Sequence, residues 1–324
     1  MDASIDVSNE SVVSPSRGIT SPGGKTALEL MKQEESQTGI VTFSAQIDEM
    51  LGGGVPLGRI TEICGPPGIG KTQLSIQLAV DVTIPEFFGG LGKQAVYIDT
   101  EGSFLVDRVY KVASATVEHI KRVAESSGDK EMKQAASQYT VEKVLSSIHH
   151  YRCHNYIELI AVVNILPEFV QQQNNQVSLI LVDSIACHFR HDIEDMTLRN
   201  RLLAGLAQNL IKLASQRQIA VVLTNQMTTR VLRGQKSQLV PALGDSWGHL
   251  CTNRIILYWG RDEVRYANLC KSSSRPEANV PYQITADGVR DIEALPRGDK
   301  AEEEGAGIQT DPAAVVTRKR PHPQ

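Results

Sequence analysis

The 324-residue chain has no excess of positive charge, and this limits how it could bind nucleic acids. It has 33 lysines and arginines against 37 aspartates and glutamates, so its formal net charge is −4 and its sequence pI is about 6.1. Attraction of a phosphate backbone by bulk charge is therefore not indicated. Any nucleic-acid contact must come from a local group of cations.

Cysteine pairs at the spacing of metal sites are also absent. The five cysteines are odd in number, widely scattered and without a CxxC pair: Cys64, Cys153, Cys187, Cys251 and Cys270. This usage favours neither a disulfide framework nor a zinc site. It is typical of a protein that keeps its thiols reduced inside the cell.

The sequence has no run of eighteen apolar residues, and its N-terminus lacks a basic segment followed by an apolar one. A membrane span and a secretory signal are therefore not indicated. Apolar residues still make up 41% of the 324 positions, enough for a substantial core in one large domain or two ordinary ones. We expect a soluble intracellular protein.

Both ends of the chain have the composition of disordered segments. Residues 1–24 are rich in Ser, Gly and Pro, and residues 295–324 combine an acidic run with Gly, Ala and Pro. We expect one folded domain over residues 25–294, without an internal repeat. The tail also carries a basic cluster of the kind that serves in nuclear import, although clusters of this length are common by chance: Arg318, Lys319 and Arg320.

The most informative motif is GPPGIGKT at residues 65–72, which has the GxxxxGK[ST] form of a phosphate-binding loop. Its glycines clear the space in which backbone N–H groups converge on phosphate oxygens. Lys71 can reach the β- and γ-phosphates, and the Thr72 hydroxyl can bind Mg²⁺. An expected strand, residues 59–64, enters the loop, and an expected helix, residues 73–82, leaves it with its N-terminus toward the phosphates. We therefore expect a nucleoside triphosphate to bind at Gly65, Pro66, Pro67, Gly68, Ile69, Gly70, Lys71, Thr72 and Gln73.

Strands and helices alternate between the two tails. Short apolar runs predict buried strands, longer amphipathic stretches predict helices, and the last two runs alternate in the manner of a β-hairpin. In chain order, we expect further strands at 95–99, 178–183, 219–224, 255–259 and 266–270, and helices at about 104–124 and 198–216. This order implies an α/β fold with a mostly parallel central sheet, helices on both faces and a C-terminal β-hairpin region.

In such sheets the ligand binds beyond the carboxyl ends of the strands, so polar residues that end strands are the first candidates for the site. Asp183 follows the apolar run LILV and is expected to orient the Mg²⁺ shell. Glu101 is expected to polarise the water that attacks the γ-phosphate; the alternative is that Asp99 or Glu101 only caps the next helix. Gln226 is either a hydrogen-bond donor to the γ-phosphate or an ordinary turn amide.

Five segments together resemble the RecA-type recombinases in their eukaryotic and archaeal form. They are GPPGIGKTQL, YIDTEGSF, LILVDS, VVLTNQMTT and ITADGVRDIE, in the order and spacing of that family, and the resemblance runs from Thr26 to Asp291. The segments LGGGVP, PALGDSWGH and RHDIEDMTLRNRLL, with the basic tail, are most similar to one eukaryotic paralogue of the RecA/Rad51 family. The resemblance implies a RecA-like ATPase core that acts in homologous recombination.

The resemblance also implies roles for individual residues. Lys71 and Thr72 would hold the phosphates and Mg²⁺, Glu101 would be the catalytic carboxylate, and Asp183 would support the metal. Gln226 matches the γ-phosphate sensor of the family.

Two further matches concern Arg108 and His249. Arg108 matches the family arginine that stacks on the adenine, for which its planar guanidinium is suited. The alternative is an exposed helical arginine paired with Asp107 or Glu101. His249 matches a histidine of the same switch region, although a single histidine is more often structural.

Two loops of the family grip DNA, and both can be located in this chain. The second corresponds to residues 227–243, whose cations carry no neighbouring acid and are expected to contact DNA phosphates unless the loop is only solvated: Arg230, Arg233 and Lys236. The first loop, near residues 190–198, is acidic where the recombinases are more basic, because it contains Asp192, Glu194 and Asp195. That charge would repel a DNA strand and weighs against intrinsic strand exchange.

In the family, ATP lies between neighbouring subunits, and the neighbour's cap corresponds to Lys271–Pro276 here. The recombinases carry an acid at the position of Lys271, so a cation there could approach the triphosphate of an adjacent subunit. The family's Phe-x-x-Ala oligomerisation motif corresponds to Gly24–Ala27, which keeps the alanine and lacks the aromatic anchor. A small helical N-terminal domain is also not found, either because the form is truncated or because this lineage dispenses with it.

We therefore expect a DNA-dependent, slow ATPase that uses ATP and Mg²⁺. It would join sister recombinase paralogues in hetero-oligomers, bind single-stranded or branched DNA, and support the main recombinase filament in the nucleus and also the cytoplasm. The alternatives are a self-assembling strand-exchange recombinase and a scaffold that uses ATP structurally. The intact Glu101 favours hydrolysis, and the acidic first loop disfavours self-assembly.

Overall fold

The computed structural model describes residues 26–29, 31, 39–230, 238–261 and 263–292. The chain divides into two units, Met1–Gln37 and Thr38–Gln324. In the first unit, the Thr26 hydroxyl oxygen accepts a hydrogen bond from the Glu29 N–H at 3.2 Å, as at the start of a helix. Several residues singled out above lie outside the described residues: Gly24, Arg233, Lys236, Arg318, Lys319 and Arg320.

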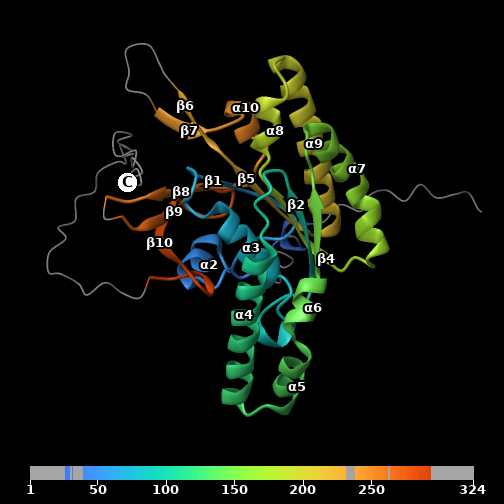
Figure 1. Ribbon diagram of the computed structural model, residues 1–324, viewed down its shortest axis with the longest axis vertical. Helices are drawn as coiled ribbons and strands as arrows, with labels where there is room; N and C mark the ends of the chain where they lie inside the picture. The colour runs from blue at the N-terminus through green and yellow to red at the C-terminus, as the bar shows by residue number, and fades with distance from the viewer. Residues whose placement is uncertain (1–25, 30, 32–38, 231–237, 262, 293–324) are drawn as a thin grey trace, which may run out of the picture. The chain divides into compact units, whose positions relative to one another are not determined.

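The second unit is built on a nine-stranded sheet with the order β11-β10-β9-β8-β1-β5-β4-β2-β3 (Figure 1). Neighbouring strands from β8 to β3 are parallel, and β9, β10 and β11 extend the sheet in antiparallel pairs. The strands are β1 Ile60–Cys64, β2 Gln94–Asp99, β3 Ile148–Arg152, β4 Val177–Asp183, β5 Ala220–Asn225, β8 Asn253–Trp259, β9 Arg265–Lys271, β10 Ala278–Thr285 and β11 Gly288–Arg290. The expected mostly parallel sheet with a C-terminal antiparallel region is confirmed.

Helices cover both faces of this sheet (Figure 1). One face packs against α2 Ala45–Leu51, α3 Lys71–Asp81, α4 Val106–Ser127, α5 Lys130–Gln138 and α6 Val141–Ser146. The other packs against α7 Tyr156–Gln172, α8 Ala186–His191 and α9 Met196–Arg217. The fold is therefore the α/β arrangement that the alternation of elements predicts.

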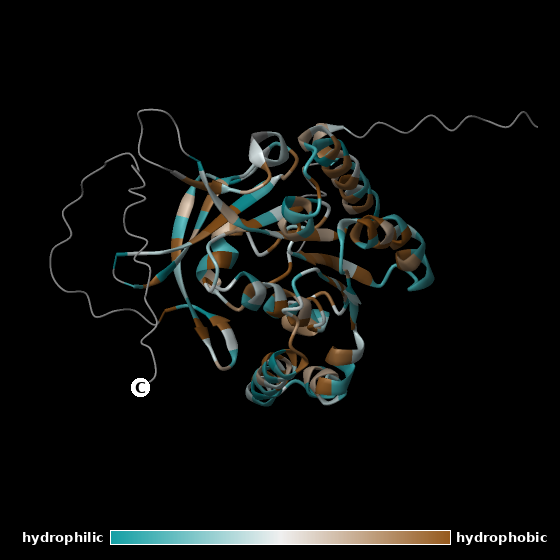
Figure 2. Cartoon of the chain, turned by 45° about the horizontal axis from the view of Figure 1, so that its top comes forward, coloured by the Kyte–Doolittle hydropathy of each residue, from teal (hydrophilic) through white to brown (hydrophobic). Residues whose placement is uncertain are grey.

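The two cores follow from the two-residue period of the strands. β4 is buried along its whole length, so its side chains alternate between the two faces. Leu179 and Leu181 enter the core beneath α3 and α4, whereas Ile180 and Val182 enter the core beneath α7 and α9. In Figure 2, apolar residues concentrate in the central strands and on the helix faces turned toward them. A continuous apolar run in the sequence is thus explained by burial on both sides.

Some elements have no clear signal in the sequence. β3 reads IHHYR and is only partly buried, because it lies at the end of the sheet and pairs with β2 alone. α7 is helical although it contains Pro167. A two-stranded sheet, β6 Met227–Arg230 and β7 Gln238–Pro241, follows β5, and the short helix α10 Gly244–Gly248 comes next. Of these elements, β6 begins directly after Gln226, one of the candidate site residues.

None of the helices in the described ranges is long and apolar enough to cross a membrane. All five cysteines fall within those ranges and carry free thiols. Burial raises the pKa of Cys64 well above its usual value, and burial likewise raises that of Cys251. Both thiols therefore stay protonated at neutral pH.

Candidate nucleotide site

The phosphate loop connects β1 to α3, as its sequence predicts. Gly68 and Gly70 have φ values of 79° and 117°, which lie in the region that favours glycine. A Cβ added to Gly70 would lie 2.3 Å from Ile284 Cδ1, and one added to Gly65 would lie 2.9 Å from Leu257 O. A side chain at Gly65 would therefore press on the β8 backbone, and one at Gly70 would push the end of the Ile284 side chain aside. The absence of side chains leaves the backbone free to curl around an anion.

Lys71 is the first residue of α3, and its ammonium reaches back over the loop. It donates hydrogen bonds to the carbonyl oxygens of Gly65 at 2.8 Å and Pro66 at 3.1 Å. Burial lowers the pKa of Lys71, and the carboxylates of Glu101 and Asp183 oppose this shift. The ammonium therefore lies in a partly desolvated place close to two acids, where its attraction to a phosphate would be stronger than in water.

Asp183 ends β4 and is only 2% exposed. Its Oδ2 accepts hydrogen bonds from Thr72 Oγ1 at 2.7 Å and from the Tyr97 hydroxyl at 2.8 Å, and its Oδ1 accepts one from Thr224 Oγ1 at 2.6 Å. Burial and the neighbouring Asp183 raise the pKa of Tyr97, so the phenol remains a donor. The structure thus brings together the hydroxyl and the carboxylate that the sequence assigned to Mg²⁺, and such oxygen ligands suit that ion.

Glu101 lies next to Gln226, from which it is separated by 125 positions in the sequence. Its Oε1 accepts hydrogen bonds from Gln226 Nε2 at 2.8 Å and from Ser184 Oγ at 2.5 Å. Gln226 Oε1 in turn accepts one from Arg190 Nη1 at 2.7 Å. The expected carboxylate and the expected sensor therefore form one polar chain, and Ser184 and Arg190 are members that the sequence analysis did not identify.

The role of Asp99 differs from that of Glu101. Asp99 Oδ1 accepts the backbone N–H groups of Glu101 at 3.1 Å, Gly102 at 2.7 Å and Ser103 at 3.2 Å. α4 begins later, at Val106, and its N-cap makes no side-chain hydrogen bond. Asp99 therefore holds the turn after β2, and neither acid caps the helix.

Arg108 joins three elements around the phosphate loop. Its Nε donates to Gln73 Oε1 at 2.6 Å and its Nη2 to Thr285 O at 2.8 Å, while its Nη1 donates to Ala286 O. Burial lowers the pKa of Arg108, and Asp287 opposes this shift. The described contacts of Arg108 thus differ from the expected alternative of a pair with Asp107 or Glu101, and its stacking on adenine stays a prediction.

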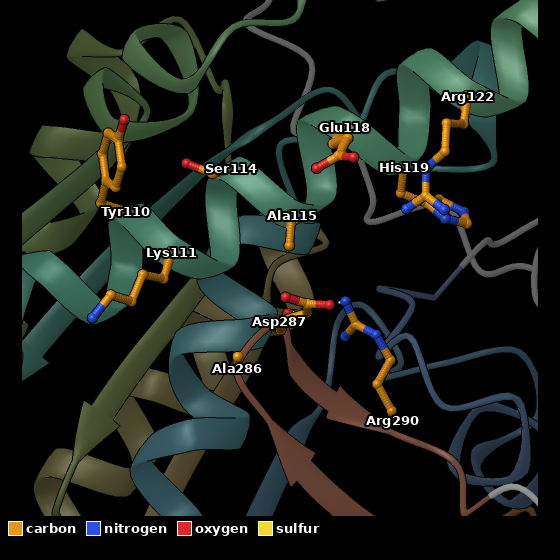
Figure 3. A pocket seen from close by; sticks show the side chains of 10 residues that line it. All are labelled: Tyr110, Lys111, Ser114, Ala115, Glu118, His119, Arg122, Ala286, Asp287 and Arg290. Atoms are coloured by element: carbon orange, nitrogen blue, oxygen red, sulfur yellow. Dashed lines mark hydrogen bonds between the residues drawn. The ribbon is translucent and has the colours of Figure 1, made fainter.

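A groove of about 320 Å³ lies between α4 and the turn from β10 to β11 (Figure 3). Figure 3 shows Asp287 and Arg290 facing α4, with His119 and Arg122 together on the helix. Cations and acids both line the groove, so its charge selects neither sign of ligand. The two walls are more than 160 positions apart in the sequence, and no local pattern could have predicted the groove.

Two of the three acids of the first loop make local contacts. Asp192 lies 3.3 Å from the His188 ring, and Asp195 caps α9 by accepting the N–H groups of Thr197 at 2.8 Å and Leu198 at 3.2 Å. In the second loop, Arg230 is exposed at the end of β6.

Lys271 occupies the end of β9 and contacts α10 within the same chain. Its Nζ donates to the carbonyl oxygens of Gly248 at 2.8 Å, His249 at 3.4 Å and Cys251 at 2.6 Å. Pro276 is exposed between β9 and β10, and His249, which directly follows α10, is exposed as well. A contact of Lys271 with another subunit's triphosphate stays a prediction, and it would compete with these three hydrogen bonds.

The comparisons with known proteins agree with this geometry. The family model described as Rad51 matches residues 33–126 and 126–292. DNA repair protein RAD51 homolog 3 of Cricetulus griseus is 52% identical over 266 residues, which cover 82% of this chain and 72% of that protein. The protein of the same name from Dictyostelium discoideum is 45% identical over 271 residues, covering 83% and 70%. DNA repair and recombination protein RadA of Aeropyrum pernix is 33% identical over 289 residues, covering 88% and 83%.

Proposed function

The chain belongs to the Rad51 family, and from this premise we propose that it is an ATP-binding, slowly hydrolysing DNA-repair protein. In this proposal it is a subunit of a recombinase-paralogue complex. The observation that carries the ATPase part is the meeting of Glu101, Gln226 and Ser184 beside the Thr72–Asp183 pair. Glu101, Asp183, Ser184 and Gln226 lie at or just after the carboxyl ends of parallel strands, next to the phosphate loop that contains Thr72.

The residues of the loop fit ATP and Mg²⁺. Lys71 and the backbone of residues 65–72 would hold the phosphates, and Thr72 with Asp183 would hold the metal. Bound Mg²⁺ would neutralise charge on the phosphate oxygens. Asp183 is suited to this role because its hydroxyl donors keep the carboxylate in one orientation.

Glu101 would act as the base that polarises the attacking water. Ser184 and Gln226 orient its carboxylate, and Arg190 orients Gln226. A phosphate contact made by Gln226 would break the hydrogen bond to Glu101 and release this carboxylate for the water. Hydrolysis would therefore be slow, because Glu101 is not free for the water until Gln226 moves away from it.

The biological setting is proposed from the relatives. Two of them are named as DNA repair proteins RAD51 homolog 3. We infer that this chain joins sister paralogues, binds single-stranded or branched DNA, and supports the main recombinase filament. It would act in the nucleus and be present in the cytoplasm.

The test separates binding from hydrolysis. Lys71→Ala should weaken binding of a fluorescent ATP analogue by about tenfold or more, since one charge-assisted contact to phosphate is lost. Glu101→Gln should bind ATP within about twofold of wild type but lose roughly 100-fold in turnover, which is the usual effect of removing a general base. Glu125→Gln, an exposed change on α4, is the matched control and should be silent.

Three results would count against all or part of the proposal. A wild-type chain that does not bind the analogue, alone or with its partners, would remove the nucleotide function. Normal turnover in Glu101→Gln would show that Glu101 is not the base. Loss of turnover in that variant with full repair in cells would favour the scaffold, in which ATP serves structurally.

A further inference from the structure

A buried carboxylate in β1, Glu62, lies outside the residues that the proposed reaction uses. It is fully buried and precedes Gly65 of the phosphate loop by three residues. Its Oε1 accepts hydrogen bonds from Asn225 Nδ2 and Trp247 Nε1, both at 2.7 Å, and its Oε2 accepts one from Arg254 Nε at 2.6 Å. The sequence could have drawn attention to this residue, because Glu62 is an acid directly before the apolar Ile63 and Cys64 in the expected strand RITEIC.

Two of the three donors, Asn225 and Trp247, flank the second loop. Asn225 ends β5 and directly precedes the sensor Gln226, while Trp247 lies in α10, which follows β7. Asn225 Nδ2 also donates to Ala242 O at 2.9 Å, and the Ala242 N–H donates to Gln226 O at 2.8 Å. The entry and the exit of the β6–β7 hairpin are therefore bound to each other and to Glu62.

The third donor, Arg254, forms an ion pair with the Glu62 carboxylate. Burial disfavours the charge on Arg254, but the adjacent Glu62 outweighs this and raises the pKa of Arg254. Arg254 also packs directly on α10, since a Cβ added to Gly248 would lie 2.9 Å from its Nη2. Asn225 uses its amide only as a donor, and its buried Oδ1 has no partner. A buried ion with three donors is costly to disturb, because removing one donor leaves charge unsatisfied.

We propose that Glu62 and Trp247 are positioning residues that couple the phosphate loop to the β6–β7 hairpin. This inference rests on the proposed function, since the two ligands are ATP and DNA. The physical basis is that a shift of β1 or of Gln226 on nucleotide binding changes the place of one carboxylate, and the hairpin stem follows through Asn225 and Trp247. Nucleotide and DNA therefore affect each other's affinity by the same factor.

The test uses Trp247→Phe, which keeps the ring volume and removes the N–H donor. The measured quantity is the affinity of the full chain, with its partner subunits, for a labelled oligothymidylate, with and without ATPγS and Mg²⁺. In wild type we expect the nucleotide to tighten DNA binding by about tenfold, within the usual range of coupling between sites. In Trp247→Phe this factor should fall below about twofold with the ATPγS affinity nearly unchanged, while the urea midpoint should fall because Glu62 loses one of its donors.

The matched control is Trp259→Phe. Trp259 is the other of the two tryptophans, is 45% exposed and packs against Arg265, so its change should preserve the coupling. The same variant leaves Trp247 as the sole tryptophan, and its emission should shift when ATPγS is added. Adding Glu62→Gln to this variant should abolish the shift.

The outcomes separate the two proposals. A wild type that binds neither ATPγS nor DNA overturns the proposed function and this inference with it. A wild type that couples the two ligands, with equal coupling in Trp247→Phe, overturns only the inference. If Trp247→Phe fails to fold, an emission of Trp247 that is unchanged by ATPγS in Trp259→Phe overturns it equally.

Discussion

Three acids in this chain that are at least partly buried accept hydrogen bonds from different kinds of donor, and the donors decide what each carboxylate can do. Asp183 accepts hydrogen bonds from hydroxyl groups, whereas Glu62 accepts them from N–H groups, one of which belongs to a guanidinium. Asp48, in α2, has a third environment. Its Oδ1 accepts the Thr42 N–H at 2.9 Å and the Thr42 hydroxyl at 2.8 Å.

Asp48 predicts a specific pH dependence of stability. Burial raises its pKa from 3.8 to about 6, against the hydrogen bonds from Thr42 and with help from Asp291. Because the folded state holds this proton more tightly than the unfolded state, the stabilising contribution is present below about pH 4 and is lost as pH rises through 6. Asp48→Asn keeps an oxygen acceptor and removes the charge, so the variant should not lose this stability as the pH rises.

The measurement is the free energy of unfolding in urea from pH 4.5 to 7.5, taken as the difference between variant and wild type. Each pKa unit is worth about 1.4 kcal/mol, and partial solvent exposure reduces the expected gain above pH 6 to roughly 1 kcal/mol. Glu49→Gln, on the exposed side of the same helix, is the control. A difference that does not change with pH would show that Asp48 ionises normally in the folded protein.

At the scale of elements, α10 shows how a short helix is held in place. It has five residues and no basic residue in its last turn. Lys271 from β9 supplies that cation, and Trp247 fixes the helix to β1. The helix that follows the second loop is therefore stabilised by tertiary contacts rather than by its own sequence.

Replacing Lys271 tests this against its proposed role in another subunit's site. Lys271→Met should lower the unfolding free energy of the isolated chain by about 1–2 kcal/mol, because three carbonyls at the helix end lose their cation. Lys271→Arg should recover part of this stability. If stability is unchanged and ATP turnover falls only in the assembled complex, Lys271 acts across the subunit interface instead.

Strands that are buried on both faces were predicted from the sequence, whereas strands with an exposed face, such as β3 and β6, were missed. β4 and β5 are wholly buried, and their apolar runs were sufficient to predict them. β3 and β6 carry polar side chains because each has an exposed face, and their pairing depends on neighbours rather than on composition. The helix α4 was predicted to begin at about 104 and begins at Val106, because the turn held by Asp99 occupies the intervening residues.

For the whole molecule, the proposed role predicts limited self-assembly. The stretch that matches the family's oligomerisation motif lacks its aromatic anchor, and such anchors contribute most of the binding energy of an interface. We expect the purified chain, with ATP and single-stranded DNA, to elute from gel filtration as small species. Sister paralogues should bind it in fixed stoichiometry when it is purified from cells.

Long homofilaments in the presence of ATP and DNA would contradict this prediction and favour the self-assembling recombinase. A useful control is the same experiment without Mg²⁺, since nucleotide-dependent assembly should be lost there. Adding back an aromatic residue by Gly24→Phe should increase self-association if the absent anchor is the cause.

The sequence by itself determined the chemistry of the phosphate loop, the alternation of strands and helices, and the identities of Asp183, Glu101 and Gln226. These features depend on neighbouring residues, because glycine spacing and burial period are local properties of the chain. Only the tertiary structure decided that Glu101 meets Gln226 and that Glu62 joins both ends of the second loop. Those contacts depend on which strands become neighbours, and strand order is set by the packing of the whole sheet.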